Sequence, residues 1–333
     1  MIRSFGTIAD GQRVDAVTLG HAHALQVEVL TYGAILRRLT FPVGGVRRDL
    51  VLHFDRLEDY LRDPAYVGPL VGRFGNRIAD GRFAVDGREF RLTANEGANH
   101  LHGGALGFGK RLWRLLEADE HRATLGYHSP AGEEGYPGSL DVTLTLLAGE
   151  HSLGITIQAR SDAPTPVNLT YHPYFNLAPD RRMDATTQRL RIPASHYLPV
   201  RAGLIPTGEM APVEDTPFDF RRPRRLAPPD PQSHPQLAHA GGYDHCWVLD
   251  RDADCACELW APDGDLRLRM CGSGPGLQFY NGQFLERTHP HIGSGLILEP
   301  QGLPNAPNEP RFPDAILRPG QDYRARIEYQ LHA

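Results

Sequence analysis

The side chain best suited to chemistry in this sequence is His172, within the segment Asn168-Leu-Thr-Tyr-His-Pro-Tyr-Phe-Asn-Leu177. An imidazole gives and takes protons near neutral pH, and the neighbouring aromatic and amide groups could hold it in one orientation while leaving it open to a ligand. Taken alone, a histidine beside tyrosine and phenylalanine is more often an ordinary core or surface residue. An acid–base role for His172 therefore depends on a partner elsewhere in the chain.

Glu299 is the carboxylate that best fits the role of partner. It closes the apolar run Gly295-Leu-Ile-Leu-Glu299 and is followed by Pro300-Gln301. Desolvation at the end of a buried strand would raise its pKa, as a general base working near pH 7 requires. A strand-end carboxylate facing water is the commoner arrangement. A second carboxylate, Asp244, precedes another apolar run and is a further candidate.

Polar groups that could hold a ligand occur where strand patterns end. The motif Gly72-Arg73-Phe-Gly-Asn76-Arg77-Ile78 supplies two guanidinium groups and an amide. Arginine can donate to several oxygens at once, which suits a polyhydroxyl ligand as well as a carboxylate. The motif lacks the spacing and the Lys-Ser/Thr pair of a phosphate loop. Neither a serine nucleophile elbow nor a dinucleotide fingerprint occurs in the chain.

The motif Asn99-His100-Leu-His102-Gly-Gly104 has two histidines two residues apart, which would share one face of a strand. The same spacing recurs elsewhere in a chain that holds 16 histidines. Zinc requires further ligands at a recognisable interval, and none is evident. We therefore expect no metal site.

Short alternating runs separated by turn residues make up most of the chain, which has 35 Gly and 28 Pro. This pattern predicts one all-β domain over residues 1–333, a large β-sandwich with few short helices. Asp86-Gly87 and Asp263-Gly264 indicate hairpins. We expect strands within 82–92, 140–147, 151–160, 255–270, 276–285, 295–299 and 323–331, a helix over 56–63 and a long surface loop over 221–242.

The bulk composition limits the partners. A net charge of -5 argues against nucleic acid, and the basic cluster Arg221–Arg225 is interpreted as surface charge. Four cysteines fit neither a zinc pattern nor a disulfide scaffold, and Cys255 and Cys257 are expected on one strand face. The sequence has no signal-peptide core and no run long enough to span a membrane, so we expect a cytoplasmic protein, a monomer or homodimer.

Seven motifs, in order along nearly the whole chain, resemble those of the aldose 1-epimerase (galactose mutarotase) family. They are 72–78, 99–104, Glu134-Gly-Tyr-Pro-Gly138, 168–177, Tyr243-Asp-His245, Leu277-Gln-Phe-Tyr280 and Leu298-Glu-Pro-Gln301. The resemblance implies a supersandwich fold and anomer interconversion of free hexoses such as galactose or glucose, without metal or cofactor. It implies Glu299 as general base and His172 as general acid. The residues that it implies for sugar binding are Asn76, Arg77, His102, Asp244 and Gln278, with Arg73 in the same motif as Arg77 and Tyr174 lining the pocket.

Two positions depart from the family pattern: Tyr171 stands where Asn is usual, and Pro173 where Ser or Thr is common. These departures leave the preferred sugar open. Three alternatives stay open as well. They are a hexose-6-phosphate 1-epimerase, a retaining glycosidase whose carboxyl groups at Asp244 and Glu299 would lie about 5–5.5 Å apart, and a sugar sensor without catalysis.

Overall fold

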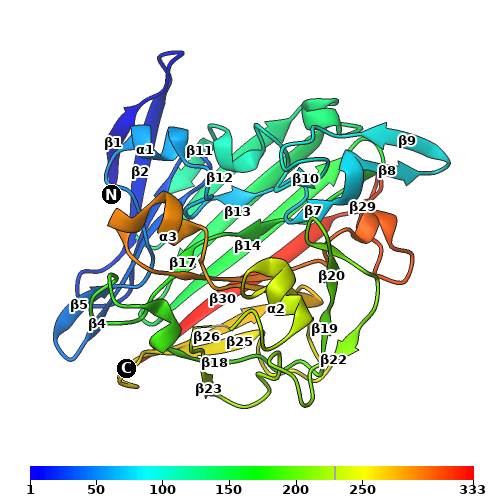
Figure 1. Ribbon diagram of the computed structural model, residues 1–333. Coiled ribbons are helices and arrows are strands. Elements are labelled where there is room, and N and C mark those ends of the chain that lie inside the picture. The colour runs from blue at the N-terminus through cyan, green and yellow to red at the C-terminus, as the bar shows by residue number, and fades with distance from the viewer. Residues whose placement is uncertain (229) are drawn as a thin grey trace.

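The longest strands form a nine-stranded antiparallel sheet in the computed structural model, which describes residues 1–228 and 230–333 (Figure 1). In β13 and β14 buried residues alternate with more exposed ones, so one face of the sheet is apolar. The order across the sheet is β11 (Arg114–Ala118), β12 (Arg122–Ser129), β13 (Leu140–Ala148), β14 (Ser152–Ser161), β30 (Tyr323–His332), β26 (Arg267–Gly272), β25 (Cys257–Trp260), β18 (Arg189–Arg191) and β23 (Arg224–Arg225).

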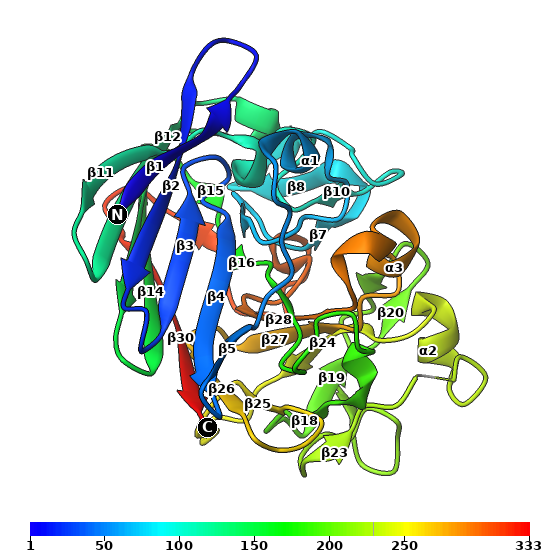
Figure 2. The same ribbon diagram turned by 90° about the vertical axis from the view of Figure 1, so that its left-hand side faces the viewer.

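Two further antiparallel sheets pack with the nine-stranded sheet. A five-stranded sheet follows chain order: β1 (Ile2–Thr7), β2 (Arg13–Gly20), β3 (Gln26–Leu30), β4 (Leu36–Val43) and β5 (Val46–Asp49). A six-stranded sheet has the order β17 (Tyr174–Phe175), β28 (Leu296–Gln301), β27 (Gly276–Tyr280), β24 (Asp244–Val248), β19 (His196–Leu198) and β22 (Ala211–Pro212). Figure 2 shows the five-stranded sheet beside β11 and β14 on one side of the molecule.

One continuous apolar core joins the three sheets. Val27 of β3, Leu144 of β13 and Leu298 of β28 belong to the same cluster of buried side chains, and each is 0% exposed. Burial of apolar surface of this kind is the dominant favourable contribution to folding. The core therefore supports the six-stranded sheet from behind and holds it in a fixed position.

Helices and short strand pairs cover the remaining edges. The α-helices are α1 (Leu57–Arg62), α2 (Pro235–Ala240) and α3 (Leu285–Thr288), with 3-10 turns at Ala79–Gly81, Phe108–Lys110, Glu133–Gly135, Ala185–Thr187, Pro290–Ile292 and Ala306–Asn308. The strand pairs are β6 (Leu70–Val71) with β16 (Thr170–Tyr171), β7 (Arg77–Ile78) with β10 (His100–Leu101), β8 (Arg82–Val85) with β9 (Arg88–Arg91), β15 (Thr165–Pro166) with β29 (Ile316–Leu317), and β20 (Val200–Arg201) with β21 (Ile205–Pro206).

The all-β class, the Asp-Gly hairpins and helix α1 agree with expectation, but three local expectations were wrong. The segment 221–242 includes helix α2, which has Pro235 in its first turn and Gly241 at φ 66 as its C-cap. The segment 276–285 is a strand only to Tyr280, and α3 begins at Leu285. Cys255 precedes strand β25 instead of sharing a strand face with Cys257.

No helix of the described residues is both long and apolar enough to cross a membrane. The four cysteines, Cys246, Cys255, Cys257 and Cys271, are free thiols.

Candidate active site

The sequence-predicted site residues, with the exception of Arg73, line one cavity of about 730 Å³. The shared members are Asn76, Arg77, His102, His172, Tyr174, Asp244, Gln278 and Glu299. They come from segments as far apart in the chain as 76 and 299, and the fold brings them to one place. A cavity of this size exceeds a single hexose and leaves room beyond the acid–base pair.

Three of these side chains project from one face of the six-stranded sheet. Glu299 of β28 lies directly opposite Gln278 of β27, and Gln278 lies opposite Cys246 of β24. Asp244 is two residues before Cys246 on β24, so its side chain points to the same face. The register of three adjacent strands therefore sets the spacing of both carboxylates and the amide between them.

The two histidines of the motif 99–104 have different roles, because β10 ends at Leu101 and His102 has a φ of 51. His100 is buried in the core, where its ring nitrogens bond with the carbonyl oxygen of Thr93 at 2.7 Å and the hydroxyl of Tyr136 at 2.6 Å. His102 instead lines the cavity. The expectation that both share a strand face was wrong, since the turn after Leu101 separates them.

His172 is held by the backbone next to Glu299. Its Nδ1 lies 2.7 Å from the carbonyl oxygen of Tyr66. A carbonyl accepts hydrogen bonds, so Nδ1 carries the proton in neutral His172 and Nε2 is free to accept one. That Nε2 lies 3.9 Å from Oε1 of Glu299. Nε2 of His172 therefore faces Glu299, and either group can hold a proton at this place.

Burial pushes the pKa values of this pair toward their neutral forms. It lowers the pKa of His172 to about 4, against the effect of the Tyr66 carbonyl. It raises the pKa of Glu299 well above its ordinary value, as does the nearby charge of Asp244, while Arg77 acts in the opposite direction. A neutral pair and an ion pair contain the same number of protons. One proton can therefore move between the two groups without exchange with solvent.

The other cavity histidine has the opposite tautomer. Nδ1 of His102 accepts a hydrogen bond from the backbone N–H of Asn76 at 3.2 Å, so its Nε2 carries the proton in the neutral form. Burial, then the nearby His172 and Arg77, hold the pKa of His102 well below its usual range. His102 is thus a neutral hydrogen-bond donor, whereas neutral His172 is an acceptor.

Arg77 ties the carboxylates of the cavity together. Its Nε and Nη2 each donate to Glu96 at 2.7 Å, and its Nη1 lies 3.6 Å from Oδ2 of Asp244. Gln278 donates to Oδ1 of Asp244 at 2.6 Å. Among the described residues, the buried atoms Oε2 of Glu299 and Oε1 of Gln278 have no hydrogen-bond partner. Acceptors of this kind in a cavity suit the hydroxyl groups of a polyol, because an unmade buried hydrogen bond is costly.

The loop that carries Tyr66 is held by Asp63. Its two carboxylate oxygens accept the backbone N–H groups of Ala65 at 2.7 Å and Val67 at 2.6 Å. His289 adds a contact of 3.1 Å to the same carboxylate. Tyr174 donates its hydroxyl to the carbonyl oxygen of Ala65 at 2.9 Å. The orientation of His172 therefore depends on a carboxylate outside the cavity that sequence reasoning missed.

Arg73 lies in the core, with 1% of its surface exposed. Its guanidinium donates to the hydroxyl of Ser129 at 2.8 Å and to the carbonyl oxygens of Ser129, Pro130, Pro137 and Gly138. It therefore organises the 129–138 segment, and the structure does not bring it to the cavity. Arg73 and Arg77 belong to one motif, yet only Arg77 reaches the other site residues.

Tyr171 also points away from the cavity. It is 0% exposed and donates its hydroxyl to the carbonyl oxygen of Ala34 at 2.8 Å. This departure from the family pattern is therefore a core substitution, and the Tyr66 carbonyl provides the orientation of His172. Sequence reasoning also missed further cavity residues. Tyr280 closes the motif 277–280 but was not singled out, and no motif marks Tyr66, Asn95, Glu96, Lys110 and Arg287.

A family model described as aldose 1-epimerase matches residues 15–330. The chain belongs to the aldose 1-epimerase family. Galactose mutarotase from Homo sapiens is 41% identical over 313 residues, which cover 90% of this chain and 89% of that protein. Aldose 1-epimerase from Escherichia coli K12 is 36% identical over 337 residues, 97% of each chain.

Solved structures of the family share the fold of this aldose 1-epimerase homologue. The crystal structure of galactose 1-epimerase from Lactobacillus acidophilus has a TM-score of 0.86 at 28% identity and covers 100% of this chain and 98% of that one. An aldose epimerase homologue from C. elegans has a TM-score of 0.86 at 29% identity, covering 95% of this chain and 98% of the other. The family, the mutarotase-like β-sandwich and the isomerase class expected from the sequence are confirmed.

Proposed function

We propose that this aldose 1-epimerase interconverts the α and β anomers of a free hexose such as galactose or glucose, with Glu299 as general base and His172 as general acid. The observation that carries the assignment is the buried pair in the cavity wall, Nε2 of His172 at 3.9 Å from Oε1 of Glu299. Anomer interconversion requires two proton transfers at oxygens attached to a single carbon. A close acid–base pair suits that requirement.

The proposed reaction begins from the ion-pair form. Glu299 accepts the proton of the C1 hydroxyl, while imidazolium His172 donates its Nε2 proton to the ring oxygen. The bond between C1 and the ring oxygen breaks, and C1 becomes an aldehyde. After rotation about the C1–C2 bond, His172 accepts the proton of the C5 hydroxyl, whose oxygen attacks C1. Glu299 returns its proton to the C1 oxygen, so both groups end as they began.

The site supports this mechanism through the tautomer of His172. Because the Tyr66 carbonyl keeps a proton on Nδ1, only Nε2 gains and loses a proton during the cycle. Substrate hydroxyls that donate to Glu299 stabilise its carboxylate and so favour the ion pair. General acid–base catalysis contributes about 10²–10⁴-fold, and fixed donors and orientation supply further acceleration.

The remaining polar groups are proposed to hold the other sugar hydroxyls. Nε2–H of His102 and the guanidinium of Arg77 are donors, and the carboxylate of Asp244 and the carbonyl of Gln278 are acceptors. Asn76 and Tyr174 complete the proposed wall. Arg73 is left out of this set because its donors are directed to core carbonyls.

A 6-phosphorylated hexose is the second candidate substrate. Lys110 and Arg287 also line the cavity. The ammonium group of Lys110 lies 5.8 Å from the ring centre of Tyr66, which itself lines the cavity. Two cationic side chains can bind a phosphate group, and the size of the cavity leaves room for one.

Polarimetry tests the proposal. Freshly dissolved α-D-galactose and α-D-glucose should equilibrate faster with catalytic amounts of protein, with and without chelator. The 6-phosphates of these sugars should be tested by polarimetry at the same concentrations. A kcat/KM larger than that for the free sugars would favour a 6-phosphorylated hexose as the substrate. Binding of a sugar without faster anomer interconversion of any tested sugar or sugar phosphate would indicate a sensor. Release of the aglycone from an aryl galactoside would indicate a glycosidase instead.

Variants at the pair connect the activity to the proposed residues. His172→Asn and Glu299→Gln should each lower kcat strongly, whereas Tyr171→Phe should not, since its side chain is in the core. A near-normal rate in either site variant, with the protein folded, would overturn the role proposed for that residue.

We also propose that residues 1–333 act as one domain, supported by the core that joins the three sheets. The net charge of -5 supports the absence of a nucleic-acid partner. Absence of a membrane partner, a monomer or homodimer, and a cytoplasmic location stay predictions. Light scattering and cell fractionation would test the last two.

A further inference from the structure

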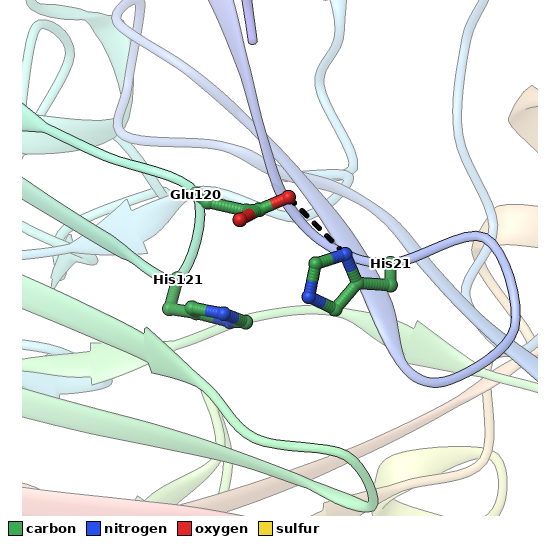
Figure 3. Close-up of side chains that lie close together, drawn as sticks. All are labelled: His21, Glu120 and His121. Atoms are coloured by element: carbon green, nitrogen blue, oxygen red, sulfur yellow. Dashed lines mark ion pairs between the residues drawn. The ribbon is translucent and has the colours of Figure 1, made fainter.

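Two imidazoles and a carboxylate meet at the tips of two hairpins, outside the cavity described above. His21 follows β2 in the turn to β3, and Glu120 and His121 form the turn between β11 and β12. Figure 3 shows the three side chains directed toward one another from the two turns. All three are exposed to solvent. The cluster therefore joins the five-stranded sheet to the nine-stranded sheet at their surface.

The distances within the cluster suit a tetrahedral metal ion. Nδ1 of His21 lies 3.2 Å from Oε1 of Glu120. Zinc bonds to nitrogen and oxygen measure about 2.0–2.2 Å, which places two ligand atoms of a tetrahedron about 3.3–3.5 Å apart. One ligand atom from each of the three residues lies within 4.8 Å of the others. Rotation of the exposed His121 ring would bring its nitrogen the remaining distance of about 1–1.5 Å.

The backbone holds all three residues in place without help from an ion. The N–H of Gly20 donates to the carbonyl oxygen of Glu120 at 2.7 Å, which joins one turn to the other. The side chain of Asp119 accepts the N–H groups of His121 and Arg122 at 2.8 Å each. Ala148 donates to the carbonyl oxygen of His121 at 2.7 Å. Metal binding would therefore order only the side chains, which keeps its entropic cost small.

An ordinary ion pair explains only part of this arrangement. His21 contacts Glu120, but His121 makes no side-chain hydrogen bond or ion pair with the described residues. Its ring instead lies 4.9 Å from that of His21 at an angle of 77°. A shared metal ion would instead contact both rings and the carboxylate at once.

We propose that His21, Glu120 and His121 bind one divalent transition-metal ion, with zinc as the expected occupant and water as its fourth ligand. Two imidazoles and a carboxylate suit zinc, nickel and copper better than magnesium or calcium. The ion would link the two turns and stabilise the folded state, because it binds the native chain and not the unfolded one. None of the three residues lines the cavity, so this site is separate from the proposed reaction.

Calorimetric titration of the chelator-treated full-length protein with zinc tests the proposal. One equivalent should bind, and His21→Ala, His121→Ala and Glu120→Gln should each weaken binding at least tenfold. His128→Ala is the matched control, because His128 pairs with Asp141 at 2.7 Å, both are exposed, and no third ligand joins them among the residues that the structure describes. That variant should bind zinc as the wild type does.

Cobalt(II) supplies a second readout that does not depend on affinity. A tetrahedral site should give strong visible absorption at one equivalent, and each of the three variants should lose it. The rate of anomer interconversion should be the same in these variants. Zinc should raise the melting temperature of the wild type and of His128→Ala, but not that of the three site variants. Binding that persists in the triple variant, or zinc that inhibits the reaction at the same concentration at which it binds, would place the metal elsewhere and overturn the proposal.

Discussion

Replacing Glu299 with Gln should remove most of the catalytic rate while making the folded protein more stable. The change keeps the shape of the side chain but removes its charge and its ability to accept a proton. Glu299 is 2% exposed, and among the described residues its Oε2 has no hydrogen-bond partner. In the proposed mechanism the carboxylate is thus placed for reaction at the expense of stability, so the substitution should lower the rate and raise the stability.

The loss of rate follows from the separation within the pair. At 3.9 Å, and with an effective dielectric constant of about 20, a carboxylate stabilises imidazolium His172 by about 4 kcal/mol. Each 1.36 kcal/mol corresponds to about a tenfold change, so the acid loses roughly three orders of magnitude of its active form. Loss of the base has an effect of similar size, about 10²–10⁴-fold. Because the two act as one unit, we expect kcat to fall by about 10³–10⁴-fold in total, with KM little changed.

The gain in stability should depend on pH. Burial raises the pKa of Glu299 in the folded protein above its value in the unfolded chain. Between these two values the folded state binds more protons, so the wild type loses stability as pH rises through that interval. Glutamine does not titrate. The melting temperature of Glu299→Gln minus that of the wild type should therefore increase from about pH 5 to pH 8.

Polarimetry of fresh α-D-galactose measures the rate, after subtraction of the spontaneous reaction, and circular dichroism measures the melting temperature. Glu309→Gln is a suitable control, because Glu309 is paired with Arg311 and its pKa is lowered instead. A kcat within tenfold of the wild type would refute the base assignment. A melting-temperature difference that does not change with pH would refute the argument from burial.

Further substitutions test the supporting residues. Asp63→Asn should lower kcat by about 10–100-fold with little change in KM, because it loosens the loop that orients His172, the proposed acid. The control Glu58→Gln, at an exposed carboxylate, should leave kcat unchanged. Equal kcat values in the two variants would show that Asp63 is dispensable. Arg73→Ala should lower the free energy of unfolding in urea by about 3 kcal/mol or more, because charged hydrogen bonds are lost. Arg77→Lys should mainly raise KM. A raised KM in Arg73→Ala with unchanged stability would place Arg73 in the site. Tyr171→Phe should cost about 0.5–1.5 kcal/mol of unfolding free energy and leave kcat unchanged, and a large loss of kcat would show that this position influences the acid after all.

The sequence predicted well what depends on local pattern. Alternation of apolar residues marked β13 and β14, Asp86-Gly87 marked the hairpin of β8 and β9, and Asp263-Gly264 marked that of β25 and β26. A two-residue period and a tight turn are both properties of neighbouring residues. The short helix α2 was missed, although Pro235 and Gly241 are ordinary helix-boundary residues, because six residues are too few to show a helical period.

By itself the sequence determined which reactive side chains are present: an imidazole at 172, a carboxylate at 299 and a set of polar groups in a recognisable order. Only the tertiary structure decided which of them meet. Strand register places Glu299 beside Gln278, and a carbonyl more than a hundred residues away in the chain sets the tautomer of His172. Arg73, four residues before Arg77, is directed into the core instead. Side-chain direction and desolvation arise from contacts between distant segments, which no local pattern records.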